Sequence, residues 1–322
     1  MKAIRVSTPG GPEVLRYEDV AEPTPKAGEA IVKVDAAGVN YIDVYQRSGQ
    51  YKLALPLTLG LEAGGTVTVV ASDVTEVRVG DKVAYTGIPG AYAQFAAVPA
   101  QRLVKLPPGV STKQGGAAML QGLTAHYLAC STYPLKSGDT CLVHAAAGGV
   151  GLLLCQIAKM RGARVIGTVS TEDKAKLARE AGASEVIVYT KQDFEAEVKR
   201  LTDGQGLQVV YDAVGKTTFD KGFNCLAPRG MMVLYGQASG PIGPFDPQTL
   251  NAKGSLFLTR PSLNHHIVTR AELLQRSNEL LGWIGDGTLK LRTEFEFPLK
   301  DASEAHRALE ARKTTGKVLL IP

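Results

Sequence analysis

The feature that most constrains the fold is a glycine-rich turn placed between an apolar strand-like run and a helical segment. The turn reads His144-Ala145-Ala146-Ala147-Gly148-Gly149-Val150-Gly151. Against the spacing G-x-G-x-x-G, Ala146 replaces the first glycine, while Gly148 and Gly151 match. Such a turn lets the backbone approach a pyrophosphate at a helix N-terminus, whose N–H groups favour an anion. We therefore predict a dinucleotide contact at Ala147, Gly148, Gly149, Val150 and Gly151; a purely structural tight turn is the alternative.

Strands and helices alternate on both sides of this turn. Strands are expected at 141–145, 164–169, 185–189, 209–213 and 231–235, and helices at 149–161, 172–181 and 194–202. Repeated βα units of this length predict an open, doubly wound parallel sheet of the Rossmann type. Ligands bind at the carboxyl edge of such a sheet, so Tyr235, Gly236 and Gln237, directly after the fifth strand, are candidate cofactor contacts.

The end of the second strand indicates which cofactor binds. NAD enzymes usually place an acidic side chain there for the ribose hydroxyl, but this strand ends in Ser170 and Thr171. Glu172 and Asp173 follow, where acids are typical of the first turn of a helix. Lys174 is positioned to pair with a 2′-phosphate, although a solvated helix lysine is the alternative. NADP(H) is favoured over NAD(H).

The two ends of the chain have a residue pattern that differs from the alternating strands and helices of the middle segment. Short β-branched runs at 30–34, 65–70, 82–85 and 92–98, separated by Gly/Pro turns, predict a barrel-like β domain. Beyond the parallel sheet, helices are expected at 270–284 and 302–314, and strands at 294–298 and 317–321. We expect this last part to fold back onto the first, which gives a catalytic domain of residues 1–123 and 265–322 around a cofactor domain of residues 124–264.

Composition excludes several classes of protein. The net charge of +5 comes without a basic stripe, so no nucleic-acid partner is expected. Arg312, Lys313 and Lys317 are expected to be solvated or to contact a single phosphate. No apolar run reaches the roughly 18 residues of a membrane helix, and no signal-peptide core is present. The four cysteines lack metal or CxxC spacing, which is typical of reduced, buried thiols in a cytoplasmic protein.

Several segments together resemble a known family. They are Gly10 to Leu15, Gly38 to Gly49, Gly122 to Ala125, His144 to Gly151, Val210 to Gly215 and Gly254 to Ser262. They resemble the medium-chain dehydrogenase/reductase superfamily, most of all its zinc-independent bacterial quinone oxidoreductase branch, related to zeta-crystallin. The resemblance covers essentially the whole chain. It implies an α/β fold in which a GroES-like β-barrel catalytic domain accompanies the doubly wound Rossmann domain.

The same resemblance bears on metal binding. Zinc alcohol dehydrogenases of this superfamily carry a ligand cysteine in the stretch matching Ala37 to Asp43, where this chain has none. Their Gly-His-Glu motif is Gly60-Leu61-Glu62 here, and leucine cannot bind zinc. We therefore predict no metal and a structural role for Glu62. Without a Lewis acid, a quinone or activated enone is a better hydride acceptor than a simple ketone.

The resemblance also implies roles for single residues. Asn40, Tyr45 and Thr124 are expected near the nicotinamide, where Asn40 would bond the ribose or carboxamide and Tyr45 would line the acceptor pocket or donate a proton. A surface position on a helix is the alternative for Tyr45. Ser170, Lys174 and Tyr189 match the 2′-phosphate region. The remaining expected cofactor contacts are Gly215, Thr259, Arg260 and, from the last helix, Arg312, for which surface exposure is equally open.

The expected activity is that of a zinc-independent NADPH:quinone oxidoreductase. Reduction of enones or alkenals, and a structural or regulatory NADPH-binding role like that of a crystallin, are the alternatives. Related proteins form homodimers through a strand near residues 250–262, and the apolar run Ser255 to Thr259 fits such an edge. A monomer that covers this strand with a helix is the alternative.

Overall fold

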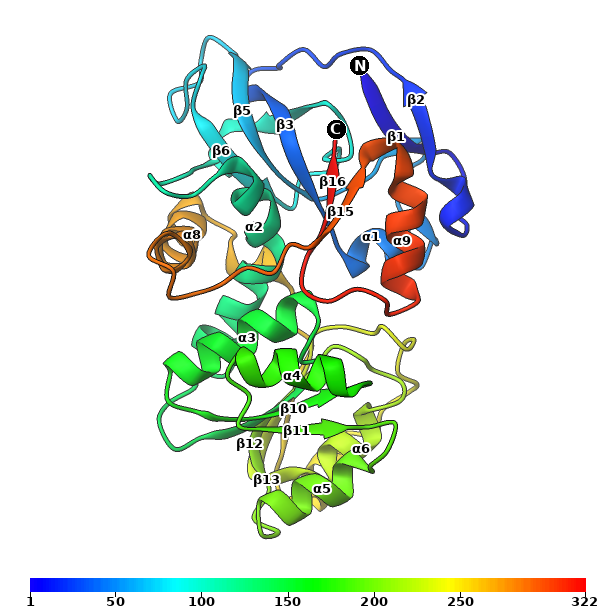
Figure 1. Cartoon of the computed structure of the whole chain (residues 1–322), viewed down its shortest axis with the longest axis vertical. Helices are drawn as coiled ribbons and strands as arrows, with labels where there is room; N and C mark the ends of the chain where they lie inside the picture. The colour runs from blue at the N-terminus through cyan, green and yellow to red at the C-terminus, as the bar shows by residue number, and fades with distance from the viewer. The chain divides into compact units, whose positions relative to one another are not determined.

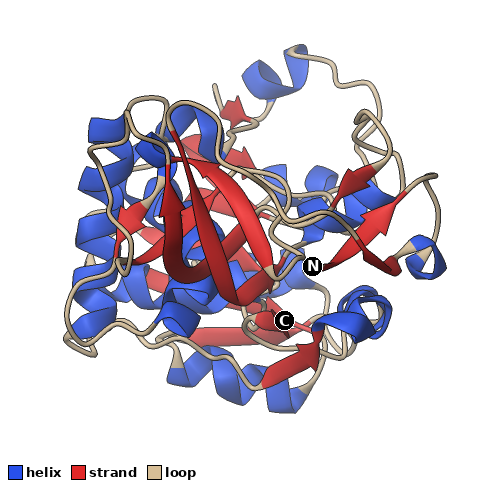
Figure 2. Cartoon of the chain, turned by 90° about the horizontal axis from the view of Figure 1, so that it is seen from above, coloured by secondary structure: helices blue, strands red, loops and turns tan.

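The computed structural model describes residues 1–322 and divides them into two compact units. Unit 1 comprises Met1–Leu123 and Ile267–Pro322, and unit 2 comprises Thr124–His266. Both chain termini lie in unit 1 (Figures 1 and 2). Unit 1 is therefore assembled from two segments that are separated in sequence by the whole of unit 2.

Unit 1 is built on a seven-stranded sheet in the order β15-β16-β3-β5-β6-β8, with β7 also paired to β3, and a three-stranded sheet β2-β1-β4. The strands are β1 (Lys2–Val6), β2 (Arg16–Asp19), β3 (Glu29–Val39), β4 (Leu57–Thr58), β5 (Glu62–Val70), β6 (Lys82–Thr86), β7 (Phe95–Pro99), β8 (Val104–Lys105), β15 (Phe295–Pro298) and β16 (Val318–Ile321). The long strand β3 pairs with β5 along most of its length, with β7 at its start and with β16 at its end. Alternate apolar residues of these strands fill the interior.

The helices of unit 1 are α1 (Tyr41–Arg47), α2 (Thr112–Tyr127, of which residues 124–127 belong to unit 2), α8 (Arg270–Gly285) and α9 (Ala302–Glu310). Thr269 and Glu272 form a capping box that starts α8. The expected extension of the last helix to residue 314 is wrong. It ends at Glu310 because Arg312 takes a left-handed conformation with φ +57°, and the N–H of Lys313 bonds back to the carbonyl of Ala308.

Unit 2 contains a six-stranded parallel sheet in the order β11-β10-β9-β12-β13-β14. Its strands are β9 (Thr140–His144), β10 (Arg164–Val169), β11 (Glu185–Val188), β12 (Leu207–Asp212), β13 (Leu226–Leu234) and β14 (Phe257–Thr259). Its helices are α3 (Gly149–Met160), α4 (Glu172–Glu180), α5 (Phe194–Leu201), α6 (Phe219–Phe223) and α7 (Gln248–Ala252). Figure 1 shows α3 and α4 on one side of the sheet and α5 and α6 on the other, so the predicted doubly wound fold is confirmed.

The strand order places a switch point between β9 and β12. From β9 the chain continues to β10 and β11 on one side, and it then returns to β12, β13 and β14 on the other. In open α/β sheets, ligands bind outside the carboxyl ends of the strands at such a point. None of the helices is long and apolar enough to cross a membrane.

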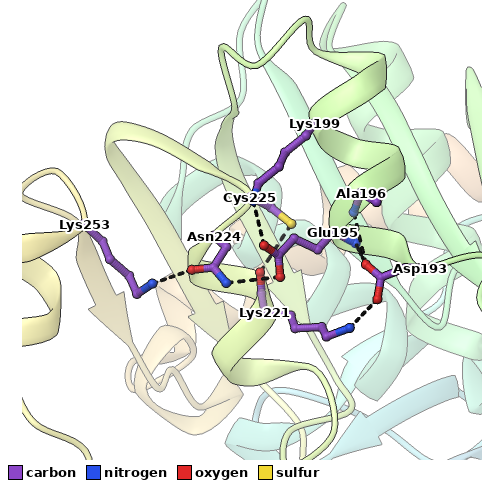
Figure 3. A network of polar contacts seen from close by, with 8 residues as sticks. All are labelled: Asp193, Glu195, Ala196, Lys199, Lys221, Asn224, Cys225 and Lys253. Carbon is purple, nitrogen blue, oxygen red and sulfur yellow. Dashed lines mark hydrogen bonds and ion pairs between the residues drawn. The ribbon is translucent and has the colours of Figure 1, made fainter.

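A network of hydrogen bonds and ion pairs connects α5 with α6 on the surface of unit 2 (Figure 3). Asp193 caps α5 through the N–H groups of Glu195 and Ala196 and pairs with Lys221 of α6. Glu195 accepts from Lys199 at 2.7 Å and from Asn224 at 3.1 Å. Exposed pairs of this kind contribute little each. The network includes none of the residues expected to bind cofactor, so it supports the scaffold.

Candidate cofactor and active site

The glycine-rich turn of unit 2 joins β9 to α3. The N–H of Gly148 bonds to the carbonyl of Ala145 at 2.8 Å, and Gly148 precedes the first residue of α3. A Cβ on Gly151 would lie 2.2 Å from the carbonyl oxygen of Ala145, so only glycine fits there. The left-handed residue of the turn is Ala145, with φ +53°, rather than Ala146. This explains why alanine is tolerated where the spacing G-x-G-x-x-G begins. The first N–H groups of α3 have no partner within the helix and can receive an anion.

The loops after β12 and β13 are bonded together at the same edge of the sheet. Asp212, the last residue of β12, accepts hydrogen bonds from the N–H groups of Val214 and Gly215 at 2.7 and 3.0 Å. Its carbonyl accepts from the N–H groups of Tyr235 and Gly236. The structure thus brings the expected residues Gly215, Tyr235, Gly236 and Gln237 together. Thr259 ends β14 at the same edge and Arg260 follows it.

The candidate 2′-phosphate residues follow two neighbouring strands. Ser170 comes directly after β10 and Tyr189 directly after β11, and the N–H of Tyr189 bonds to the carbonyl of Val169 at 3.0 Å. Lys174 lies in the first turn of α4, which Thr171 caps by accepting from the N–H of Lys174. The carboxylate of Glu172 pairs with Lys191 at 2.9 Å. Glu172 is therefore an acid near the position used for a ribose hydroxyl, but its carboxylate is already paired with the ammonium group of Lys191.

Two histidines of unit 2 are buried, as expected of structural partners. His144 Nδ1 lies 2.8 Å from Thr168 Oγ1, and its ring packs edge-on against Phe194. Burial lowers the pKa of His144. His126 is buried as well. His144 therefore joins β9 to β10 beneath the turn and is poorly suited to act as a base.

In unit 1, the side chain of Asn40 lies between two oppositely charged groups. Its Oδ1 accepts from Lys317 Nζ at 2.9 Å, and its Nδ2 donates to Glu62 Oε2 at 2.9 Å and to the carbonyl of Gly38 at 3.2 Å. Lys317 also forms an ion pair with Glu62, and the two side chains are 2% and 0% exposed. The expectation that Lys317 is solvated or meets a phosphate is wrong, because Lys317 comes directly before β16, which pairs with β3, and its side chain is buried.

A second buried group of polar side chains begins at Asp43 of α1. Tyr92 donates to Asp43 Oδ2 at 2.8 Å and lies 3.2 Å from His306 Nε2. Arg47, 2% exposed, donates to His306 Nδ1 at 3.1 Å and forms two hydrogen bonds with Glu310. Because Arg47 can only donate, the neutral ring of His306 carries its proton on Nε2 and donates to Tyr92. The result is a directed chain of hydrogen bonds from Arg47 through His306 and Tyr92 to Asp43.

Burial shifts the pKa values of two members of this chain, Asp43 at its end and His306 within it. Desolvation raises the pKa of Asp43 to about 7, although the hydrogen bonds from the Asn40 N–H and Tyr92 act to lower it. Desolvation, with a smaller contribution from the charge of Arg47, lowers the pKa of His306 to about 3. Sequence reasoning missed this chain of hydrogen bonds, because Tyr92 and His306 lie far in the sequence from Asp43 and Arg47.

The other expected residues lie as follows. Tyr45 is buried on α1, and its ring centroid is 5.9 Å from that of Tyr41 and 5.4 Å from that of Tyr51. Its place at the acceptor remains a prediction. Thr124 lies in α2. Arg312 lies just beyond α9 instead of within the last helix.

The residues of unit 1 do not suit zinc. Where the zinc alcohol dehydrogenases have a cysteine and a histidine, this chain has the amide of Asn40, held by Glu62 and Lys317, and the apolar side chain of Leu61. No group of three or more His, Cys, Asp or Glu side chains is arranged to hold a metal ion. The carboxylate of Glu62 is already paired with the ammonium of Lys317, which disfavours a cation at this position.

A barrel-like β unit is interrupted in sequence by a doubly wound unit that has a glycine turn at its switch point, and this architecture indicates a dinucleotide-dependent dehydrogenase or reductase. Comparisons agree with this class. Residues 26–108 match the family "Alcohol dehydrogenase GroES-like domain" and residues 149–280 match "Zinc-binding dehydrogenase". The chain belongs to the medium-chain dehydrogenase/reductase superfamily, in its zinc-independent quinone oxidoreductase branch. The resemblance noted in the sequence is thereby confirmed.

Individual relatives match along their full length. The chain is 46% identical to a quinone oxidoreductase of Pseudomonas aeruginosa, over 100% of this chain and 99% of that protein. It is 40% identical to a 2-haloacrylate reductase of a Burkholderia species, over 97% and 96%. The crystal structure of Escherichia coli quinone oxidoreductase in complex with NADPH superposes with a TM-score of 0.98 at 44% identity, and covers 100% of both chains.

Proposed function

We propose that the chain is a zinc-independent NADPH:quinone oxidoreductase that transfers reducing equivalents from NADPH to a quinone. The observation that carries the proposal is the carboxyl edge of the parallel sheet. There, a turn in which only glycine fits at position 151 lies beside the end of β10, which is followed by Ser170 and, in the first turn of α4, by Lys174. Full-length similarity to proteins named quinone oxidoreductase, one of them solved with NADPH, supports both the cofactor and the reaction.

The residues at this edge suit NADPH. Ala147, Gly148, Gly149, Val150 and Gly151 would receive the pyrophosphate at the start of α3. Ser170, Lys174 and Tyr189 would bind the 2′-phosphate. The remaining contacts at this edge are assigned to Gly215, Tyr235, Gly236, Gln237, Thr259 and Arg260, and one further contact is assigned to Arg312 of unit 1. When bound, NADPH supplies the reducing equivalents, and the protein contributes orientation and exclusion of water.

The catalytic residues are assigned as Asn40, Tyr45 and Thr124. Asn40 would bond the ribose or carboxamide at the nicotinamide end, and Thr124 would lie near the same group. Tyr45 would line the site of the acceptor. A quinone absorbs the negative charge delivered with hydride through its own conjugation, so no Lewis acid is required.

The direct test is NADPH oxidation followed at 340 nm, with NADH in parallel, against 1,4-benzoquinone and 9,10-phenanthrenequinone. We expect quinone turnover that prefers NADPH and does not respond to a chelator. Tight NADPH binding without turnover on any acceptor would instead support the structural or regulatory, crystallin-like role. Loss of activity with a chelator would contradict the assignment of Asn40 and Leu61 as residues that leave no zinc site.

A second candidate function is the reduction of an activated alkene. The observation that favours it is the similarity to a 2-haloacrylate reductase, which extends over nearly the whole of both chains. Both reactions need the same hydride donor and a conjugated acceptor. Competitive steady-state kinetics with a quinone and an alkenal would rank them, and a higher kcat/KM for the alkenal would replace the first proposal with the second.

Lys174 provides a test of the cofactor assignment. The variant Lys174→Ala is expected to raise KM for NADPH about tenfold or more, since a hydrogen bond to a charged group contributes roughly 1.5–3 kcal/mol, and to leave KM for NADH unchanged. Lys176→Ala is the matched control, because Lys176 lies on the same helix and is exposed. Equal effects of Lys174→Ala on both cofactors would contradict the 2′-phosphate assignment.

The proposal includes a homodimer formed through β14. This strand is the edge of the sheet, and its first residue, Phe257, is 55% exposed. An exposed apolar edge strand is a template for pairing with a second copy. The variant Phe257→Asp is therefore expected to convert the dimer to a monomer in light scattering after gel filtration, and Val79→Asp, which alters an exposed valine of unit 1, is expected to leave it a dimer. A dimer that persists with Phe257→Asp would exclude this strand as the interface.

The proposal also places the protein in the cytoplasm. None of the four cysteines forms a disulfide, and Cys141, Cys155 and Cys225 are buried. Burial raises the pKa of the Cys155 thiol to about 12, which keeps it protonated and unreactive. Thiols in this state suit a reducing compartment.

A further inference from the structure

Every hydrogen of the Asn40 amide is already used within unit 1. One N–H of Nδ2 meets Glu62 Oε2 at 2.9 Å and the other meets the carbonyl of Gly38 at 3.2 Å. Oδ1 has two lone pairs, of which Lys317 Nζ takes one at 2.9 Å. Asn40 is 3% exposed. The single group that it can still offer a ligand is one acceptor position on Oδ1.

Charge fixes this orientation of the amide. The ammonium of Lys317 can only donate, and the carboxylate of Glu62 can only accept. A flipped amide would place N–H groups against the ammonium and its oxygen against the carboxylate. Both charged side chains are buried, so water does not weaken the preference.

The backbone holds both charged residues in place. Glu62 Oε1 accepts from the N–H of Leu120 in α2 at 2.7 Å, so the carboxylate cannot rotate away. The N–H of Lys317 bonds to the carbonyl of Arg292 at 2.8 Å. The two groups therefore reach Asn40 from different parts of the chain, Glu62 from β5 and Lys317 from the residue directly before β16.

We propose that Glu62 and Lys317 are positioning residues that present Asn40 to the nicotinamide half of the cofactor as a hydrogen-bond acceptor only. This inference rests on the proposed function, which places Asn40 at the nicotinamide. The ligand group that Asn40 takes is then a donor, such as a ribose hydroxyl or the N–H of the carboxamide. Asn40 has no hydrogen left to donate to the oxygen of a quinone.

The test separates orientation from stability with the double variant Glu62→Gln/Lys317→Met. Lys317→Met alone leaves a buried carboxylate unpaired, so we expect a markedly lower Tm. The double variant removes both charges at nearly constant volume, and its Tm is expected to recover toward that of the wild type. A glutamine in place of Glu62 can both donate and accept, so it no longer dictates the direction of the amide. Asn40 can then turn its N–H groups toward the ligand.

Two functional readouts follow. In single-turnover experiments with NADPH and its 4-deuterated form, the double variant is expected to transfer hydride about tenfold more slowly or worse, because a wrongly oriented buried hydrogen bond is costly. The affinity for 2′,5′-ADP should be unchanged, while the gain in affinity from 2′,5′-ADP to NADPH should fall. Asp81→Asn/Lys105→Met, which removes another ion pair of unit 1, should change none of these values.

A thermodynamic cycle tests whether the pair acts through Asn40. Asn40→Ala should slow hydride transfer to a similar extent, and adding Glu62→Gln/Lys317→Met to it should cause little further loss. If the losses add, or if the double variant regains the wild-type rate together with its Tm, the pair is structural and the inference is overturned. A wild-type protein that binds NADPH without reducing a quinone would contradict the proposed function alone, because the affinity comparison would still test the orientation of Asn40.

Discussion

In the variant Asp43→Asn, the free energy of unfolding is expected to rise with pH between about 3 and 6.5, a pH dependence that the wild type lacks over most of this range. The reason is that folding shifts the pKa values of Asp43 and His306 in opposite directions, so that their effects on the pH dependence of stability cancel in the wild type. Asn keeps an oxygen that can accept from the N–H of Asn40 and from Tyr92, so the variant removes the titration with little change in shape.

The signs follow from proton counts. The pKa of His306 falls from 6.5 to about 3 on folding, so between these values the unfolded chain binds the extra proton and stability increases with pH. The pKa of Asp43 rises from 3.8 to about 7, so between these values the folded protein holds the extra proton and stability decreases with pH. From about pH 4 to 6.5, the folded and unfolded states each carry one proton on this pair, and the two slopes cancel.

In each single variant, the change of the free energy of unfolding with pH comes from the residue that remains. His306→Gln should be most stable in acid and lose stability as the pH rises from about 4 to 7, whereas Asp43→Asn should lose stability as the pH falls toward 3. The change across each window is on the order of 4 kcal/mol, at about 1.4 kcal/mol for each pKa unit. Urea denaturation at a series of pH values measures it. The double variant should run parallel to the wild type, and single variants that also run parallel would show that the pair does not titrate as described.

Gly151→Ala is expected to weaken NADPH binding about 100-fold, through loss of the helix N–H groups that receive the pyrophosphate, and to lower the free energy of unfolding by about 3 kcal/mol. The added Cβ would lie 2.2 Å from the oxygen of Ala145 and 2.8 Å from the Cα of Ala146. Both are backbone atoms, so the turn has to open instead of a side chain moving aside.

The measurements for this variant are an NADPH fluorescence titration and chemical denaturation. Gly243→Ala is the matched control within unit 2, because no atom lies within 4 Å of its added Cβ. Wild-type affinity for NADPH in Gly151→Ala would mean that the turn between β9 and α3 does not bind the cofactor.

The local parts of the fold were predictable from sequence, and α2 was not. The strand at 164–169 was predicted to the residue, because an apolar run flanked by turn residues is a short-range signal. The helix α2 was missed since Gly115, Gly116 and Gly122 weaken its helical pattern. Gly116 is there for a tertiary reason: an added Cβ would lie 2.5 Å from the oxygen of Ala36 in β3.

The candidate site divides in the same way. The residues expected at the carboxyl edge of the parallel sheet follow directly from strand order, so sequence reasoning could place them together. Lys317 could not be placed, because its partners Asn40 and Glu62 lie 277 and 255 residues away. A lysine near the end of a chain gives no signal of burial until the pairing of β16 with β3 is known.

The discontinuity of unit 1 has a consequence for the order of events during synthesis. Unit 2 is one uninterrupted segment, so it can fold as soon as it leaves the ribosome. The end of β3, however, must wait for β16, whose residues are translated long after those of β3. Until then, Asn40 and Glu62 lack the ammonium group of Lys317, and the end of β3 is an open sheet edge even when unit 2 has already folded. Chaperone capture during translation should therefore concentrate on residues 37–39, the part of β3 that pairs with β16.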